Sequence, residues 1–305
     1  MVRPDDCSLK PLQRKLIRKH ACQSLKDADA FGVFPTPVAA VMEAAKVVIA
    51  DEDLSDEGFL KRICSKADAT SKTLRRALSK VLGVLHVAAK TIYLDKAVHV
   101  AKLPFLKLHE TAHAVLPWQK DIYAVTEDCE MTLAPEIASE FEREANVFAM
   151  EVMFQLDTFT KEAADHDFNI LVPVNLSRRF GTSIYSSIRR YTSEHHRACL
   201  VLVLNMPQVH KDLGFTCGLR RVISSTSFEE QFGNLNWPEY FSPDDEIGAA
   251  IPVGGRRMSG QRQITLVDRN GNLNQCLAEA FTQTYQVFIL IHSVEALTTK
   301  RVLVR

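Results

Sequence analysis

Residues 109–113 read HETAH, in which two histidines stand four positions apart and a glutamate follows the first. On a helix, side chains at i and i+4 lie on one face, so the imidazoles of His109 and His113 can reach a single metal ion. Neutral imidazole nitrogens suit Zn²⁺, and two of them with one carboxylate leave a fourth coordination position open. Glu110 projects beside that site, where its carboxylate can handle a water on the metal. The motif therefore predicts one Zn²⁺ per chain, bound by His109 and His113.

A third protein ligand is expected from a following helix, and residues 140–146 read EFEREAN. Glu142 borders the apolar face of that helix and aligns at i+4 with Asn146, whose side chain can orient a carboxylate without touching the metal. Glu144 points nearer the opposite side. We therefore expect Glu142 as the third ligand and Glu144 as its main rival. The alternative is that these glutamates simply face solvent, as many helix glutamates do.

The elements that must hold these residues can also be predicted from the sequence. Pro104 and Pro117 bracket the helix that carries HETAH, because proline fits the first turn of a helix and ends one further along. The second ligand helix is expected over 135–156. Three more elements are expected from periodicity and residue type: a helix that starts at the prolines of 35–37, a helix over 70–88, and a strand at 91–95.

The second half of the chain has a different pattern. Residues 174–192 indicate two short helices joined at Gly181, a helix-turn-helix outline. After Arg197 come short extended runs separated by turn residues, and Asn270-Gly271 between two of them is typical of a type I′ hairpin. The expected strands read ACLVLVL, TCGLRRVIS, IGAAIPV, ITLV and TYQVFILI. The predicted fold class is α+β, with a mainly helical domain that contains a small sheet, followed by a mostly antiparallel β domain.

Composition excludes several function classes. The 37 basic residues balance the 37 acidic ones, which argues against a protein that coats nucleic acid. The N-terminal residues contain no apolar signal segment, and the longest apolar runs are too short to span a bilayer. The seven cysteines form no C-x-x-C, which excludes a thiolate zinc finger and argues against a disulfide framework. We expect a cytoplasmic protein with no membrane partner.

Several separated strings, in the same order, resemble the ImmA/IrrE family of zinc metallopeptidases. KLHETAHAVL and EREANVFAMEVM carry the resemblance, and PTPVAAVMEAAKVVI, TIYLD and NLSRRFGTSIYSSIRRYTS agree with it over roughly residues 33–200. The resemblance implies a zincin-like domain in which His109, His113 and Glu142 hold zinc and Glu110 is the catalytic carboxylate. The sequence departs from the family at Ala112, where a glycine is common, and at residues 152–155, which read VMFQ where the family often has Leu-Leu-Met-Pro. These departures concern the groove wall and the substrate.

The resemblance also implies a domain order. Residues 1–32 are expected to form a basic helical extension, 33–160 the zincin-like peptidase domain, and 161–195 a helix-turn-helix-like segment. Some family members end in a GAF-like domain, and this would suit a β-rich, sensory domain over 196–305. Members characteristically cut a helix-turn-helix repressor and so relieve repression of a stress response or a mobile element.

The resulting hypothesis is a zinc-dependent endopeptidase whose substrate is a helix-turn-helix repressor of the XRE type. Zinc lowers the pKa of a bound water to about 7, and Glu110 takes the proton and returns it to the leaving amine. A second donor to the oxyanion is expected from Tyr93, His166 or Tyr185, among which the sequence does not choose.

The alternative hypothesis is a zinc-containing transcriptional regulator, or a DNA-binding protein, that cleaves nothing. It depends on the arginines of the helix-turn-helix outline, which can meet phosphates or base edges. These are Arg178, Arg179, Arg189 and Arg190. The balanced charge of the chain and the shortness of the outline make direct DNA binding the weaker of the two hypotheses.

Overall fold

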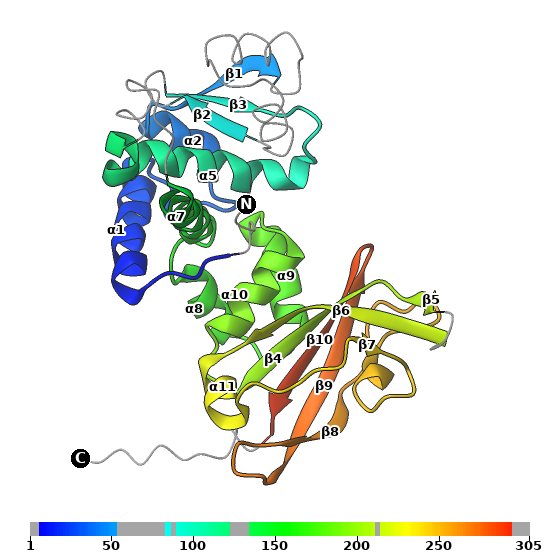
Figure 1. Cartoon of the computed structure of the whole chain (residues 1–305). Coiled ribbons are helices and arrows are strands. Elements are labelled where there is room, and N and C mark those ends of the chain that lie inside the picture. The colour runs from blue at the N-terminus through cyan, green and yellow to red at the C-terminus, as the bar shows by residue number, and fades with distance from the viewer. Residues whose placement is uncertain (1–5, 54–82, 87–89, 123–133, 211–213, 295–305) are drawn as a thin grey trace, which may run out of the picture. The chain divides into compact units, whose positions relative to one another are not determined.

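A computed structural model of the chain describes residues 6–53, 83–86, 90–122, 134–210 and 214–294 (Figure 1). The contacts group them into two compact units. Unit 1 comprises Met1–Phe159 with Arg178–Ser183, and unit 2 comprises Thr160–Ser177 with Ile184–Arg305. The architecture is α+β, as predicted, whereas the division into four segments stays a prediction. No helix in the described part of the chain is both long and apolar enough to cross a membrane.

Unit 1 places a small sheet on one side of a helix layer. Its helices are α1 (Pro11–Asp27), α2 (Val38–Ala44), the short 3₁₀ helix η1 (Val100–Lys102), α5 (Leu103–Val115) and α7 (Pro135–Met153). Its strands are β1 (Val48–Asp53), β2 (Gly83–His86) and β3 (Thr91–Leu94), in the order β1-β3-β2. Strand β3 pairs parallel with β1 and antiparallel with β2. Figure 1 shows α5 between the sheet and α7, with α1 beside α7.

Both ligand helices begin close to where the sequence predicted. Helix α5 has Pro104 in its first turn, as the proline predicted, and α7 begins at residue 135, the start of the range predicted for the second ligand helix. Their apolar faces share one core, in which Leu108 and Ala112 of α5 lie with Ala145 and Phe148 of α7. This core fixes the rotation of each helix and therefore decides which polar residues can meet.

Helix α1 belongs to that same core. Ile17, Ala21 and Leu25 recur at helical spacing and are fully buried. The basic residues between them lie on the other faces of the helix, as is typical of an amphipathic helix packed on a core. The core of unit 1 thus includes the helix of the segment 1–32, which the sequence predicted as a basic helical extension.

The predicted helix over 70–88 is wrong where the structure can test it. Gly83–His86 is strand β2, and its backbone pairs with β3. Glycine is a poor helix former, and pairing with a β-branched strand satisfies the backbone better than a last helical turn. The other residues of that predicted helix lie outside the described part of the chain. The separate prediction of a strand at 91–95 is confirmed as β3.

Unit 2 is built on an antiparallel sheet of seven strands. The strand order is β5 (Gln208–His210), β6 (Gly214–Ser224), β4 (Cys199–Asn205), β10 (Gln286–Ser293), β9 (Leu273–Gln283) and β8 (Arg262–Val267), and β7 (Tyr240–Phe241) also pairs with β6. Its helices are α8 (Thr158–Ala164), α9 (Leu171–Phe180), α10 (Ile184–Ser193), α11 (Thr226–Phe232) and the 3₁₀ helix η2 (Gly248–Ala250). The ends of α8 and α9 extend into unit 1.

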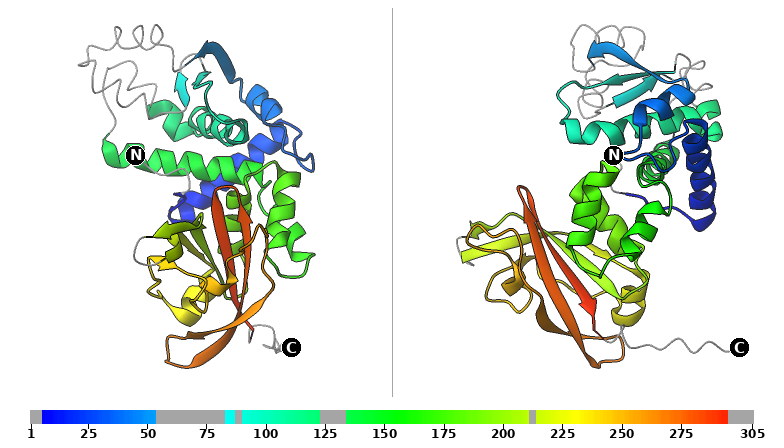
Figure 2. Two further views of the ribbon diagram at one scale, coloured as in Figure 1. Left: turned by 90° about the vertical axis from the view of Figure 1, so that its right-hand side faces the viewer. Right: turned by 180° about the vertical axis from the view of Figure 1, so that it is seen from behind.

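Both faces of this sheet are covered, which explains its uninterrupted apolar runs. Alternate residues of β4 point to opposite faces, so Val201 packs near Ile188 of α10 while Leu202 packs near Phe228 of α11. Figure 2 shows α10, in green, against the sheet from two further directions. The prediction of a mostly antiparallel β domain is confirmed.

Two details of unit 2 differ from the predictions. The run IGAAIPV contains η2 in place of the predicted strand. Gly248 begins η2 and lies so close to Ser242 that a Cβ on Gly248 would be 1.8 Å from the carbonyl oxygen of Ser242. The hairpin at Asn270-Gly271 is confirmed, but its turn is not type I′. Of the two residues only Gly271 has a positive φ, of 83°, which fits a type I turn followed by a left-handed glycine.

Candidate metal centre

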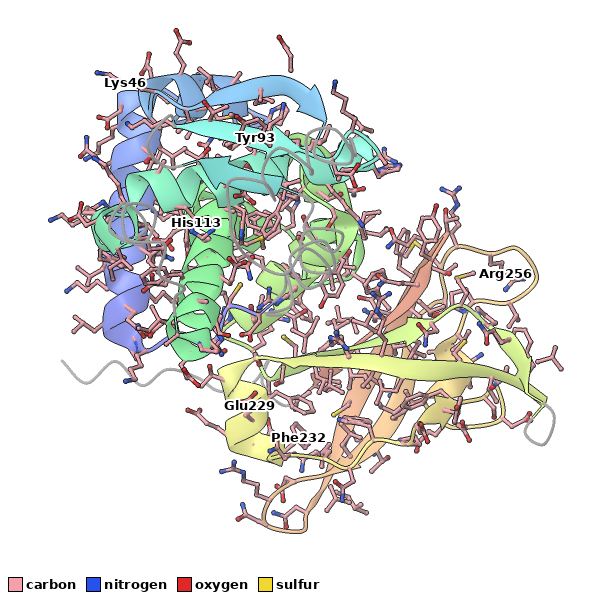
Figure 3. All side chains as sticks on the ribbon, turned by 45° about the horizontal axis from the view of Figure 1, so that its top comes forward. Lys46, Tyr93, His113, Glu229, Phe232 and Arg256 are labelled. Atoms are coloured by element: carbon pink, nitrogen blue, oxygen red, sulfur yellow. The ribbon has the colours of Figure 1, made fainter. Side chains whose placement is uncertain are left out.

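His109 and His113 lie one turn apart on α5, and Figure 3 labels His113 on that helix. Their side chains are nearly buried, and the ring centroids are 5.2 Å apart with an angle of 82° between the ring planes. The Pro104 start and the buried Leu108 and Ala112 fix the phase of the helix, so that both imidazoles share the side that faces α7. The i, i+4 spacing of the sequence thus becomes a pair of converging rings.

Glu142 of α7 completes a three-ligand group. Its carboxylate oxygens lie 3.3 Å from Nε2 of His109 and 3.7 Å from Nε2 of His113. One ligand atom from each of the three residues lies within 4.8 Å of the other two. The structure therefore brings together the three side chains expected from the sequence, and it chooses Glu142 over Glu144.

The donor set fits a tetrahedral Zn²⁺. Two imidazole nitrogens and a carboxylate are typical of catalytic zinc sites, which keep the fourth position open. Ligand atoms about 2.0–2.1 Å from such an ion are roughly 3.3 Å from one another, close to the separations at Glu142. The side chain of Glu142 is 42% exposed, whereas those of the two histidines are at most 10% exposed, so the open side of the group lies near the carboxylate.

The charges of the group are coupled. Burial alone would lower the pKa of His109, but its hydrogen bond with Glu142 and the charges of Glu110 and Glu142 raise it overall. Burial alone would raise the pKa of Glu142, and the same hydrogen bond and the two histidines lower it overall. Burial and the proximity of His109 lower the pKa of His113 to about 4. These effects favour the charged forms of His109 and Glu142 and the neutral form of His113.

Each histidine has an amide partner behind it. Nδ1 of His109 lies 3.0 Å from Oδ1 of Asn146, and the amide nitrogen of Asn146 donates to the backbone carbonyl of Asp6 at 3.2 Å. Nδ1 of His113 lies 2.7 Å from Oε1 of Gln119. The sequence predicted that Asn146 orients a carboxylate, and the structure instead places it against the ring of His109.

Glu144, which the sequence left as the alternative third ligand, does not belong to this three-residue group. It is buried, and its Oε2 accepts hydrogen bonds from the indole of Trp118 at 2.7 Å and from the amide of Gln119 at 2.6 Å. The ring of Trp118 also lies edge-on to that of His20. Gln119 was missed, because a single glutamine in a helical stretch has no distinctive sequence signal.

The structure also gives the positions of the predicted catalytic carboxylate and of the three candidate donors to the oxyanion. Glu110 is 6% exposed and lies beside His109, whose pKa its charge raises. Tyr93 lies on β3, in the same unit as the ligands, and is labelled in Figure 3. His166 and Tyr185 belong to unit 2, where the ring of Tyr185 lies 6.5 Å from that of Phe288. Of the three candidate donors, only Tyr93 therefore shares a unit with the ligands.

The predicted helix-turn-helix outline is present as two helices, and its four arginines differ in exposure. Arg190 is buried and forms an ion pair of 2.8 Å with Glu194, one turn further along. Arg178 and Arg179 are exposed, although the guanidinium of Arg179 lies 4.4 Å from the centre of the Phe34 ring, and Arg189 is half-buried. Arg190 therefore does not contribute to the exposed basic surface of this helix pair.

Comparison with known proteins gives a likeness of fold. No family model matches the chain, and no curated protein matches it. Among solved structures, a Mycobacterium tuberculosis protein described as a transcriptional regulator is similar with a TM-score of 0.50 and 12% sequence identity. The similarity covers 92% of this chain and 76% of that chain. At this identity the likeness concerns the fold alone.

Proposed function

We propose that the chain is a zinc-dependent endopeptidase that hydrolyses a peptide bond in a protein substrate. The observation that carries the proposal is the convergence of His109, His113 and Glu142, from two helices, with the carboxylate of Glu110 next to the first histidine. The buried histidines and the partly exposed carboxylate leave one side from which a peptide can approach.

Each residue of the proposed site has its own role in the reaction. When bound, Zn²⁺ supplies Lewis-acid chemistry that acidifies water and polarises a carbonyl. His109, His113 and Glu142 hold the ion. Glu110 accepts the proton of the attacking water and returns it to the leaving amine, a role that contributes about 10²–10⁴-fold in rate. Tyr93 is our candidate for the donor to the oxyanion.

The finer assignments follow from the family resemblance of the sequence. We propose that unit 1 is a zincin-like peptidase domain of the ImmA/IrrE kind and that the sheet of unit 2 is GAF-like and sensory. The proposed substrate is a helix-turn-helix repressor of the XRE type, whose cleavage would derepress genes for a stress response or a mobile element.

Co-expression with candidate helix-turn-helix repressors of the XRE type tests the function. A shortened partner is expected with wild type and not with Glu110→Gln, when both chains contain Zn²⁺. The matched control is Glu136→Gln, which changes an exposed glutamate at the start of α7 and should cleave like wild type. Equal cleavage by Glu110→Gln and wild type would remove Glu110 from the mechanism.

A second candidate function is transcriptional regulation without proteolysis. The observation that favours it is the description of the similar M. tuberculosis protein as a transcriptional regulator. Binding to duplex DNA that weakens steeply as salt increases would support this candidate, because released counterions drive such binding. Proteolysis that does not depend on DNA would favour the endopeptidase.

A further inference from the structure

We propose that Gln119 and Glu144 are positioning residues, which hold the ring of His113 with its proton on Nδ1 and so keep Nε2 ready for a metal. This inference rests on the metal site of the proposed function. It concerns two residues outside the ligand set that no family motif assigned. Its basis is a chain of hydrogen bonds in which the donor and the acceptor of each bond can be assigned.

The first step is the orientation of the Gln119 amide. Its nitrogen lies 2.6 Å from a carboxylate oxygen of Glu144 and 3.3 Å from the backbone carbonyl oxygen of Phe141. The carbonyl of Phe141 can only accept, and Oε2 of Glu144 acts as an acceptor because it also faces the indole N–H of Trp118, which can only donate. The –NH₂ end of the amide must therefore face them, since its two hydrogens match two acceptors. A flipped amide would place oxygen against oxygen at both contacts.

The second step follows for His113. Once the –NH₂ end of Gln119 faces Glu144, its carbonyl oxygen faces Nδ1 of His113, at 2.7 Å. A carbonyl oxygen only accepts, so Nδ1 must carry the hydrogen. In a neutral imidazole the other nitrogen then has the free lone pair. That nitrogen, Nε2, is the atom that lies 3.7 Å from Glu142.

Trp118 fixes the acceptor role of this Glu144 oxygen. Its indole N–H, which can only donate, lies 2.7 Å from the same oxygen of Glu144 that accepts from Gln119. An oxygen that faces an indole N–H cannot itself carry the hydrogen of that contact, so it accepts from Gln119 as well. Because Glu144 is 4% exposed, few other partners can reach it, and its orientation is fixed.

The other histidine has the same kind of support. The amide nitrogen of Asn146 donates to the backbone carbonyl of Asp6 at 3.2 Å, which turns its Oδ1 toward Nδ1 of His109. In both histidines an amide oxygen thus faces Nδ1, so that Nε2 is the nitrogen directed at the metal position. Each amide is in turn oriented by an acceptor that faces its nitrogen. Outer partners of this kind typically contribute 10–100-fold to metal affinity.

The tautomer can be measured without any metal. Long-range ¹H–¹⁵N spectra of the full-length chain, labelled at histidine and kept metal-free near neutral pH, report which ring nitrogen carries the proton. His113→Gln identifies the signals of His113. The expected result is the Nδ1–H form in wild type, and a loss of that strict preference in Gln119→Leu. A wild-type His113 in the Nε2–H form would overturn the inference.

Metal affinity gives the second readout. Competition with a chelator should show that Gln119→Leu binds Zn²⁺ about 10–100-fold more weakly than wild type. Glu144→Gln and Trp118→Phe should weaken binding in the same direction and by less, because each leaves part of the chain of hydrogen bonds. The matched controls are Gln23→Leu and Glu136→Gln, which change exposed residues of α1 and α7 and should bind like wild type.

The outcomes separate this inference from the proposed function. If Gln119→Leu does not fold, the smaller changes Glu144→Gln and Trp118→Phe carry the test, and wild-type affinity in both would overturn it. Wild-type affinity in a folded Gln119→Leu would also overturn it. A wild-type chain that binds Zn²⁺ through an Nδ1–H His113 but cleaves no protein would contradict the endopeptidase and leave the positioning role intact.

Discussion

Nε2 of His109 and a carboxylate oxygen of Glu142 lie 3.3 Å apart, and the two side chains form an ion pair between α5 and α7. The pKa of His109 is raised above 6.5 and that of His113 is lowered to about 4, so near pH 6 the first ring carries a proton and the second does not. A metal must displace the proton of His109. We therefore expect Zn²⁺ uptake at about pH 6 to release close to one proton.

Calorimetry in buffers with different ionisation enthalpies measures that number. Affinity should also increase with pH until His109 has lost its proton, because the proton and the metal compete for Nε2. His109→Gln should remove the proton release together with most of the affinity. Release of two protons at pH 6 would mean that His113 is also protonated there, contrary to the effect of its burial.

Glu142→Ala should abolish the stabilisation of the chain by zinc. A ligand that binds only the folded state at 1,000 times its Kd stabilises it by about 4 kcal/mol, and this gain requires the complete ligand set. Melting curves with and without Zn²⁺ should show a clear shift for wild type and little or none for the variant. A full shift in Glu142→Ala would show that another group supplies the third ligand.

Glu110→Gln should separate metal binding from catalysis. The amide has nearly the same shape as the carboxylate but cannot accept a proton, so cleavage should fall by about 10²–10⁴-fold while one Zn²⁺ per chain is retained. Metal content and turnover are measured on the same preparation. Loss of the metal in this variant would mean that Glu110 helps to hold the ion.

Gln155→Ala should destabilise unit 1 through the backbone groups that its side chain holds. The side chain is 1% exposed, accepts from the backbone N–H of Gly32 at 2.8 Å, and donates to the carbonyls of Ala30 and Val33. Truncation leaves these backbone groups without their partner, which costs about 2–3 kcal/mol. Urea unfolding measures the loss, with Gln23→Ala as the exposed control. A loss below about 0.5 kcal/mol would show that water replaces the side chain.

Acid should destabilise unit 2 through His195. Burial, followed by the nearby His196, Arg197 and His292, lowers its pKa from 6.5 to about 4. The folded state thus favours the neutral ring, and the stability that this represents is present above about pH 6.5 and is lost as pH falls toward 4. His195→Asn keeps an acceptor for the backbone N–H of Arg197 and should flatten this part of the stability–pH curve. A curve identical to that of wild type would contradict the assignment.

Local patterns predicted the parts of the site that depend on one element. The spacing of His109 and His113 and the proline at the start of α5 were sufficient, because helix geometry and proline stereochemistry act within one or two turns. The apolar runs of β4 and β10 similarly identified buried strands. In the helix predicted over 70–88, local periodicity failed at β2, where pairing with a strand from another part of the chain decided the structure.

What the sequence determined by itself was the chemistry available: two imidazoles on one helix and several carboxylates on another. Only the tertiary structure decided which carboxylate meets the rings, because the docking of α7 on α5 turns Glu142 toward them and Glu144 toward Trp118 and Gln119. The role of Gln119 also arose there, since an amide acquires a fixed direction only from the partners that surround it. Periodicity sets the face of a helix, and packing sets what that face meets.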